Sequence, residues 1–146
     1  MNRLLITFLL LVAAVQAQDL PEGRGKELLE KICTVCHDLE LVANNHNDKK
    51  GWEDPIAEMV TRGADGTRDE IQTILNYVAK YFGPLIDVNK AAAKELETEL
   101  EITAKEAAAI VQYRQDKGSF KEWADLGKVS DLDHKKIEPL KGRITF

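Results

Sequence analysis

Residues 33–37 read Cys-Thr-Val-Cys-His, and this stretch decides how the first half of the chain is organised. The spacing is that of covalent haem attachment, in which Cys33 and Cys36 each form a thioether with one vinyl group of the porphyrin. His37 follows directly, so its neutral imidazole can bind the haem iron as the proximal ligand. We therefore expect one covalently bound haem c, with its iron, at this motif.

Cys-x-x-Cys pairs also occur in zinc sites, in thioredoxin-like redox sites and as structural disulfides. A zinc ribbon needs a second ligand pair, and His46 and His134 do not supply one at a suitable spacing. A thioredoxin-like site needs a βαβ context, which this sequence does not show. A disulfide across two residues closes a loop too short to stabilise the chain appreciably. Haem attachment is the interpretation that we favour.

The first 17 residues have the pattern of a secretory signal peptide. Arg3 gives a positive start, residues 4–15 form an apolar run, and Val15-Gln16-Ala17 is a small-residue cleavage site before Gln18. The run is shorter than the roughly 20 residues that cross a bilayer. We therefore expect cleavage, no transmembrane anchor afterwards, and a periplasmic or otherwise exported protein, which agrees with haem attachment outside the cytoplasm.

The mature chain is expected to form two domains, residues 18–83 and residues 84–146, with the boundary at Gly83-Pro84. The first carries 8 basic and 13 acidic side chains, and the second carries 11 and 12. Neither domain is basic, since their net charges are −5 and −1. Helical periodicity dominates both, and strand-like alternation is confined to residues 85–88, so the sequence predicts an all-α protein.

Helical periodicity organises the first domain around the motif. The apolar positions before the motif share one helical face: Gly25, Leu28, Leu29 and Ile32. Thr67 and Glu70 form a capping box for a second helix. The apolar stripe of that helix comprises Ile71, Ile74, Leu75 and Val78, with Tyr77 beside it. A glycine opposite an aromatic ring lets two backbones approach closely, so we expect Gly25 to face Tyr77 where the helices cross.

This arrangement resembles a small class I cytochrome c, in which a glycine and an apolar residue precede the first haem cysteine by eight and four positions and an aromatic residue lies on the last helix. Gly25, Leu29 and Tyr77 stand at those places. The resemblance covers residues 22–83 and is closest to the compact monohaem cytochromes that serve as electron-accepting subunits of periplasmic dehydrogenases. Its further matching residues are Trp52, Met59-Val60 and Arg62-Gly63-Ala64. It implies a compact cytochrome c-like helical domain.

The sixth ligand of the iron has two candidates. Met59 is the only methionine of the mature chain, so a thioether ligand can only be Met59. It shares a helical face with Trp52 and other apolar residues, which leaves the alternative that Met59 is a core residue. His46 is the rival ligand, although its polar surroundings at residues 44–48 indicate an exposed loop. His134 reads as an exposed helix start.

Ligation by His37 and Met59 leaves the iron without an open position for a substrate. We therefore predict that the protein is not an enzyme but an exported monohaem c-type cytochrome that performs outer-sphere electron transfer, as a carrier or as the electron-transfer subunit of a dehydrogenase complex. The implied partners are redox proteins that donate and accept the electron. A gas-binding or peroxidatic haem protein with an open sixth site is an alternative.

The second domain has the pattern of paired helical hairpins. Asn89 can cap an alanine-rich helix, and Thr103 with Glu106 forms a capping box for the next helix, which ends at Lys117-Gly118. A last helix is expected from about residue 133 to residue 141. The side chains expected to pack inward are Phe120, Trp123, Leu126, Ile137 and Leu140.

This order resembles the tandem helix-hairpin-helix domain of bacterial DNA-uptake receptors over residues 86–146. The segments that carry the resemblance are residues 88–91, 110–114, 118–120 and 143–146. In that family each hairpin turn carries Gly-Ile-Gly or a close variant, which lets backbone N–H groups approach a DNA phosphate. Here residues 100–103 read Leu-Glu-Ile-Thr and residues 130–133 read Ser-Asp-Leu-Asp.

Acidic side chains at the point of phosphate approach oppose DNA binding, and a net charge of −1 gives no compensating field. We therefore expect a degenerate helix-hairpin-helix domain that serves as a docking module, without DNA as a partner because the hairpin glycines are absent. The alternative is a haem-bearing DNA-binding or DNA-uptake protein.

Overall fold

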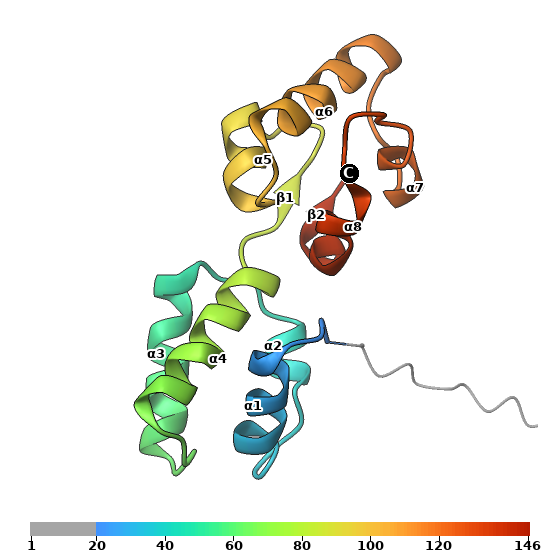
Figure 1. Cartoon of the computed structure of the whole chain (residues 1–146). Helices are drawn as coiled ribbons and strands as arrows, with labels where there is room; N and C mark the ends of the chain where they lie inside the picture. Colours follow the sequence, from blue (N-terminus) through green and yellow to red (C-terminus); the bar gives the residue numbers. More distant parts are fainter. Residues whose placement is uncertain (1–19) are drawn as a thin grey trace, which may run out of the picture.

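The computed structural model describes residues 20–146, so the predicted signal peptide, residues 1–17, lies outside the described residues. The first half contains α1 (Arg24–Cys33), α2 (Glu40–Ala43), α3 (Lys49–Thr61) and α4 (Arg68–Tyr81). The second half contains β1 (Ile86–Asp87), α5 (Ala93–Glu99), α6 (Ala104–Lys117), α7 (Trp123–Leu126), α8 (His134–Ile137), the 3-10 helix η1 (Glu138–Arg143) and β2 (Ile144–Thr145). Helices dominate both halves (Figure 1), which confirms the all-α prediction. Within the described range, no helix is long and apolar enough to cross a membrane.

In the first half, α4 lies between α1 and α3 (Figure 1). The face of α1 that the periodicity predicted is the buried one, and it comprises Gly25, Leu28, Leu29 and Ile32. The capping box of Thr67 and Glu70 is present at the start of α4. Because α1 ends at Cys33, its packing against α4 fixes where the haem motif begins.

Gly25 and Tyr77 meet where α1 and α4 pack together. A Cβ atom on Gly25 would overlap the Cβ and ring atoms of Tyr77, so only glycine permits this approach. The Tyr77 hydroxyl donates a hydrogen bond to the carbonyl oxygen of Pro21 at 2.6 Å, and burial raises the pKa of Tyr77. The close contact predicted from the sequence is confirmed.

Trp52 and His46 connect α3 and the loop before it to the end of α4. The indole N–H of Trp52 donates to the carbonyl oxygen of Phe82 at 3.0 Å, and Nδ1 of His46 lies 3.1 Å from the carbonyl oxygen of Gly83. His46 is half-buried as a result. His46 lies in a loop, as predicted, but its predicted exposure is wrong, because a backbone carbonyl from a distant part of the chain supplies a polar partner.

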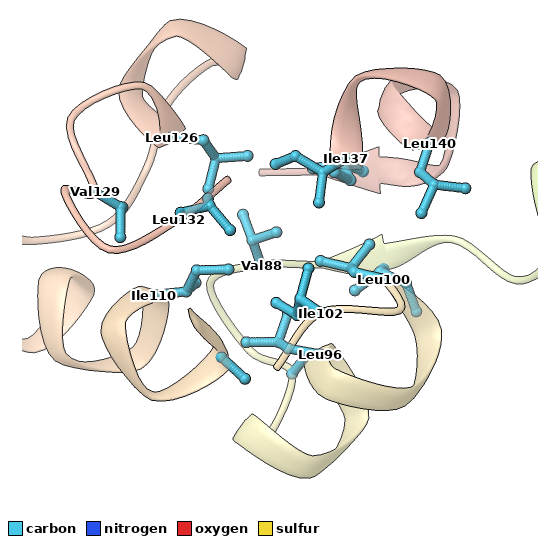
Figure 2. Close-up of a cluster of buried hydrophobic side chains, with 14 of the residues drawn as sticks. Val88, Leu96, Leu100, Ile102, Ile110, Leu126, Val129, Leu132, Ile137 and Leu140 are labelled. Atoms are coloured by element: carbon cyan, nitrogen blue, oxygen red, sulfur yellow. The ribbon is translucent and has the colours of Figure 1, made fainter. Parts of the chain in front are cut away.

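The second half has a hydrophobic core of its own. In this core the first hairpin, formed by α5 and α6, faces the second hairpin, formed by α7 and α8, around Val88 (Figure 2). Its fully buried leucine and isoleucine side chains are Leu96, Leu100, Ile110, Leu126, Ile137 and Leu140. Phe120 is buried in this core, and Trp123 packs against it, as predicted. A separate cluster of buried side chains, from Leu20 to Phe82, forms the core of the first half.

Asn89 does not cap a helix. Its side-chain amide instead bonds both backbone groups of Phe120: Nδ2 donates to the carbonyl oxygen at 2.9 Å, and Oδ1 accepts from the N–H at 2.8 Å. The helix expected after Asn89 begins only at Ala93. The amide is thus used to hold the segment before the first hairpin against the segment between the hairpins.

The end of the chain also differs from the prediction. The last α-helix is only four residues long and continues as η1, because Pro139 has no N–H to donate to the carbonyl four residues earlier. The final residues form a strand that was not predicted from the sequence: β2 pairs with β1 in parallel, with Ile144 opposite Ile86. This pairing closes the second half by joining its first and last segments.

Arg143 connects the two halves from a buried position, with 3% of its surface exposed. Its guanidinium donates to three carbonyl oxygens, those of Lys80 at the end of α4, Pro84 in the connection and Glu99 at the end of α5. It also pairs with the Glu99 carboxylate at 2.6 Å. A second ion pair, between Lys80 and Glu101, joins the same two helix ends.

Candidate functional sites

The residues of the haem motif line a cavity of about 470 Å³ in the first half. Cys33, Cys36 and His37 contribute one part of its lining, and Met59 contributes from α3. The volume lies within the range of about 300–1,000 Å³ that is typical of small-molecule and cofactor pockets. The chain therefore places all four predicted haem-binding residues around one cavity.

The imidazole of His37 is exposed and is oriented by a hydrogen bond. Its Nδ1 lies 2.6 Å from the carbonyl oxygen of Asp38. Because a carbonyl oxygen can only accept, Nδ1 is the donor, and the neutral imidazole in this tautomer has its lone pair on Nε2, where a metal ion can bind. A hydrogen bond of this kind is the usual way in which a protein orients a histidine ligand.

The two cysteines differ in exposure. Cys33 is half-buried at the end of α1, and burial raises the pKa of its thiol, whereas Cys36 is exposed. Both thiols are free to react. The neighbouring apolar side chains Val35 and Leu41 also line the cavity although they are 78% and 64% exposed. A planar apolar group held by the two cysteines would cover this surface.

Met59 is neither fully buried nor free in solvent. It is half-buried on α3 and faces the cavity, while Trp52 on the same helix is fully buried and Val60 is 41% exposed. The helical face that Met59 shares with Trp52 is therefore not buried along its whole length. His46 does not line the cavity, since its Nδ1 is engaged with the carbonyl oxygen of Gly83.

The cavity lining contains the side chains that covalent haem would need, namely two cysteines, a histidine and a methionine. Within residues 20–146, no three His, Cys, Asp or Glu side chains are grouped so that they could hold a metal ion by themselves. An iron here would depend on the porphyrin nitrogens, with His37 and Met59 available as protein ligands.

The second candidate site lies between the two hairpins of the second half. Glu106 is buried on α6, and its carboxylate accepts hydrogen bonds from the N–H and hydroxyl of Thr103, both at 2.7 Å, and from the N–H of Asp133 at 3.1 Å. The hydroxyl of Thr103 contributes most to lowering the pKa of Glu106, to about 2. One ionised carboxylate therefore satisfies backbone donors of both hairpins.

Two lysine ion pairs link the hairpins near this site. Lys136 of α8 lies 3.5 Å from Glu106, and Lys105 of α6 pairs with Asp131, in the turn of the second hairpin, at 2.6 Å. The hydrogen bond to Asp131 raises the pKa of Lys105. The capping box found in the sequence thus has a second role that its pattern did not reveal. The one feature that could have revealed this role is that Glu106 is a carboxylate on the buried face of α6, together with Ala107 and Ile110.

Glu101 occupies the turn of the first hairpin with φ of +52°, in the left-handed region. A non-glycine residue there costs roughly 1–2 kcal/mol. We expect Glu101→Gly to raise the free energy of unfolding by about 1 kcal/mol, less the small contribution of its ion pair with Lys80. Chemical denaturation would measure this. Glu101→Gln is the matched control, because it removes the charge and keeps the strained backbone; a glycine variant no more stable than the glutamine variant would contradict the prediction.

Comparison with known proteins bears on this second half. Residues 83–145 match the family model of the helix-hairpin-helix motif. The second half of the chain is a helix-hairpin-helix domain. ComE operon protein 1 of Bacillus subtilis (strain 168) is 35% identical over 63 residues, which make up 43% of this chain and 31% of that protein. The chain thus aligns with about a third of the length of this relative. No solved structure matches the chain.

These matches correct the main functional prediction. The comparisons support the helix-hairpin-helix half and give no support to a cytochrome, so the prediction of an electron-transfer cytochrome with a docking domain is wrong, and its alternative, a DNA-binding or DNA-uptake protein, fits better. The exclusion of DNA as a partner, which was based on the missing hairpin glycines, is corrected for the same reason. The scaffold of the hairpins therefore says more about this half of the chain than the acidic side chains in its turns do.

Proposed function

We propose that this protein binds DNA through its helix-hairpin-helix domain, in the manner of a DNA-uptake protein, and that its first half carries covalent haem. The observation that supports DNA binding is the family match over residues 83–145. The hairpins of that domain are held side by side, because Glu106 bonds to the starts of α6 and α8. We also propose that the protein is exported, from the signal peptide pattern of residues 1–17.

Exposed lysines near the two hairpin turns supply the charge for this contact. The side chain of Lys105 on α6 is 79% exposed, and that of Lys136 on α8 is 47% exposed. Lys135, which directly precedes Lys136, is exposed as well. Lysines of this kind contact phosphate oxygens and do not read bases. The proposed binding is therefore independent of sequence and sensitive to salt.

Charge reversal on α6 tests the proposed face. Lys105 and Lys117 lie at opposite ends of this helix, about 18 Å apart along its axis. We expect Lys105→Glu to weaken binding to a labelled DNA duplex by about tenfold or more, and Lys117→Glu, with the same change of net charge, to weaken it much less. Fluorescence anisotropy with the full chain at low salt measures both. Equal losses for the two variants would place the contact elsewhere.

The haem proposal rests on the cavity that Cys33, Cys36, His37 and Met59 share, on the hydrogen bond that engages Nδ1 of His37 and leaves Nε2 for a ligand, and on the apolar lining. When bound, haem supplies an iron that can change oxidation state or bind an axial ligand. The protein would hold the group through the two cysteines and provide His37 and Met59 as ligands, while the apolar side chains exclude water.

Mass and visible spectra test this part independently of DNA. Protein produced with haem-attachment machinery should gain the mass of one haem, and Cys33→Ala with Cys36→Ala should gain none. The weak red band of sulfur-to-iron charge transfer should disappear in Met59→Ala and persist in His46→Ala. Wild type without added mass would refute haem attachment, and a band that survives Met59→Ala would exclude Met59 as the ligand.

A further inference from the structure

Two ion pairs cross between the hairpins in opposite directions. Lys105, in the first turn of α6, pairs with Asp131 in the turn of the second hairpin at 2.6 Å. Lys136, on α8 of the second hairpin, lies 3.5 Å from Glu106 of the first. Each hairpin therefore neutralises a lysine of the other hairpin with one of its own carboxylates.

These are the lysines on which the proposed DNA contact depends. A phosphate that approaches Lys105 must displace the Asp131 carboxylate or accept it as a neighbour of like charge. Asp131 stands in the Ser-Asp-Leu-Asp turn, where the resembling family carries glycine, and its side chain is 53% exposed. Asp131 therefore contributes a negative charge at the surface without serving the hydrophobic core.

Glu106 has a different environment. It is 6% exposed, and the hydrogen bonds from Thr103 and Asp133 hold it in place and keep its pKa low. Its charge is therefore permanent at any physiological pH. Lys136 can leave it to contact a phosphate, but only by leaving a buried carboxylate with one partner fewer.

We propose that Asp131 and Glu106 determine how strongly this domain binds nucleic acid: they act as internal competitors of the phosphate backbone of duplex DNA by pairing with Lys105 and Lys136. The inference rests on the proposed function. This competition explains how a helix-hairpin-helix scaffold can carry acidic turns. The scaffold presents the lysines, and the two carboxylates determine how readily those lysines bind phosphate. The chain is thus built for weak contact with DNA that is readily released.

Asp131→Asn is the decisive variant, because Asp131 is exposed and its loss does not disturb the core. Its matched control is Asp116→Asn, which changes the net charge equally at the far, C-terminal end of α6. The measurement is anisotropy of a labelled duplex with the full chain at several salt concentrations. We expect Asp131→Asn to bind about fivefold more tightly than Asp116→Asn at 50 mM salt, with a log–log salt slope steeper by about 0.9, the value for one further phosphate contact.

Glu106→Gln provides a second test, with circular dichroism to establish that it is folded. The amide removes the charge and keeps an oxygen that can accept from Thr103, although the bond from the Asp133 N–H is lost; with the fold intact, the same increase in affinity and in slope is expected. If wild type binds DNA but Asp131→Asn binds no better than Asp116→Asn, the inference is overturned and the proposed function stands. If neither wild type nor any variant binds at the lowest salt, the proposed function itself fails, and the inference with it.

Discussion

Replacing Arg143 by methionine should lower the free energy of unfolding by about 3–5 kcal/mol. The guanidinium is 3% exposed and satisfies the carbonyl oxygens of Lys80, Pro84 and Glu99 as well as the Glu99 carboxylate. Methionine fills much of the volume but leaves these acceptors without a donor, and each buried acceptor that loses its partner costs roughly 1–3 kcal/mol.

Urea denaturation followed by circular dichroism measures this loss. Lys141→Met is the matched control, because Lys141 is an exposed cation in the same 3-10 helix whose contact with the Trp123 ring contributes about 1 kcal/mol at most. The bonds of Arg143 join α4 to the second half, so its loss should also separate the unfolding of the two halves into two transitions. A single transition with a loss below about 1 kcal/mol would show that Arg143 does not hold the halves together.

Replacing Gly25 by alanine should lower the free energy of unfolding by about 2–3 kcal/mol, although alanine favours helix. The added methyl group overlaps the Cβ and ring of Tyr77, so α1 must move away from α4 or Tyr77 must leave its rotamer. A change of the Tyr77 rotamer weakens the bond from its hydroxyl to Pro21. A movement of α1 shifts the helix that ends at the haem motif.

Gly142→Ala controls for the change of residue type. A Cβ at Gly142 has no neighbour within 4 Å, so this variant should be within about 1 kcal/mol of wild type. Thermal unfolding of both variants, each compared with wild type, gives the difference. Should Gly25→Ala prove as stable as Gly142→Ala, the close packing of α1 on α4 would be disproved.

The features that could be predicted from the sequence are those that depend on neighbouring residues. The buried face of α1 and the capping boxes at Thr67 and Thr103 follow from spacing within one turn or two. The Gly25–Tyr77 contact was accessible because a glycine on an apolar helical face requires a large partner. Met59 and Cys33 line one cavity, and their roles in haem binding stay a prediction.

The features that were missed depend on residues far apart in the chain. Arg143 bonds to residues 44 to 63 positions away, and β2 pairs with a strand at the other end of the domain. Asn89 and His46 looked like a helix cap and an exposed loop residue because their true partners, Phe120 and Gly83, are 31 and 37 positions away. A polar residue seen in sequence shows its capacity for hydrogen bonds but not where the partner is.

The functional prediction went wrong for a related reason. The acidic turns were judged as isolated charges, whereas each pairs with a lysine: Glu101 with Lys80 and Asp131 with Lys105. A paired carboxylate reduces phosphate binding without abolishing it. The net charge of the domain therefore says less about DNA than the arrangement of its charges does.

The salt dependence of DNA binding by the full wild-type chain tests the central claim most directly. A labelled duplex of about 20 base pairs should be bound at low salt, with a dissociation constant of about 10⁻⁴–10⁻⁶ M near physiological salt. The logarithm of the association constant should fall linearly with the logarithm of salt concentration, with a slope that corresponds to two or three phosphate contacts at about 0.9 each. No change in anisotropy at the lowest salt, up to millimolar protein, would contradict the proposal that this helix-hairpin-helix domain binds DNA.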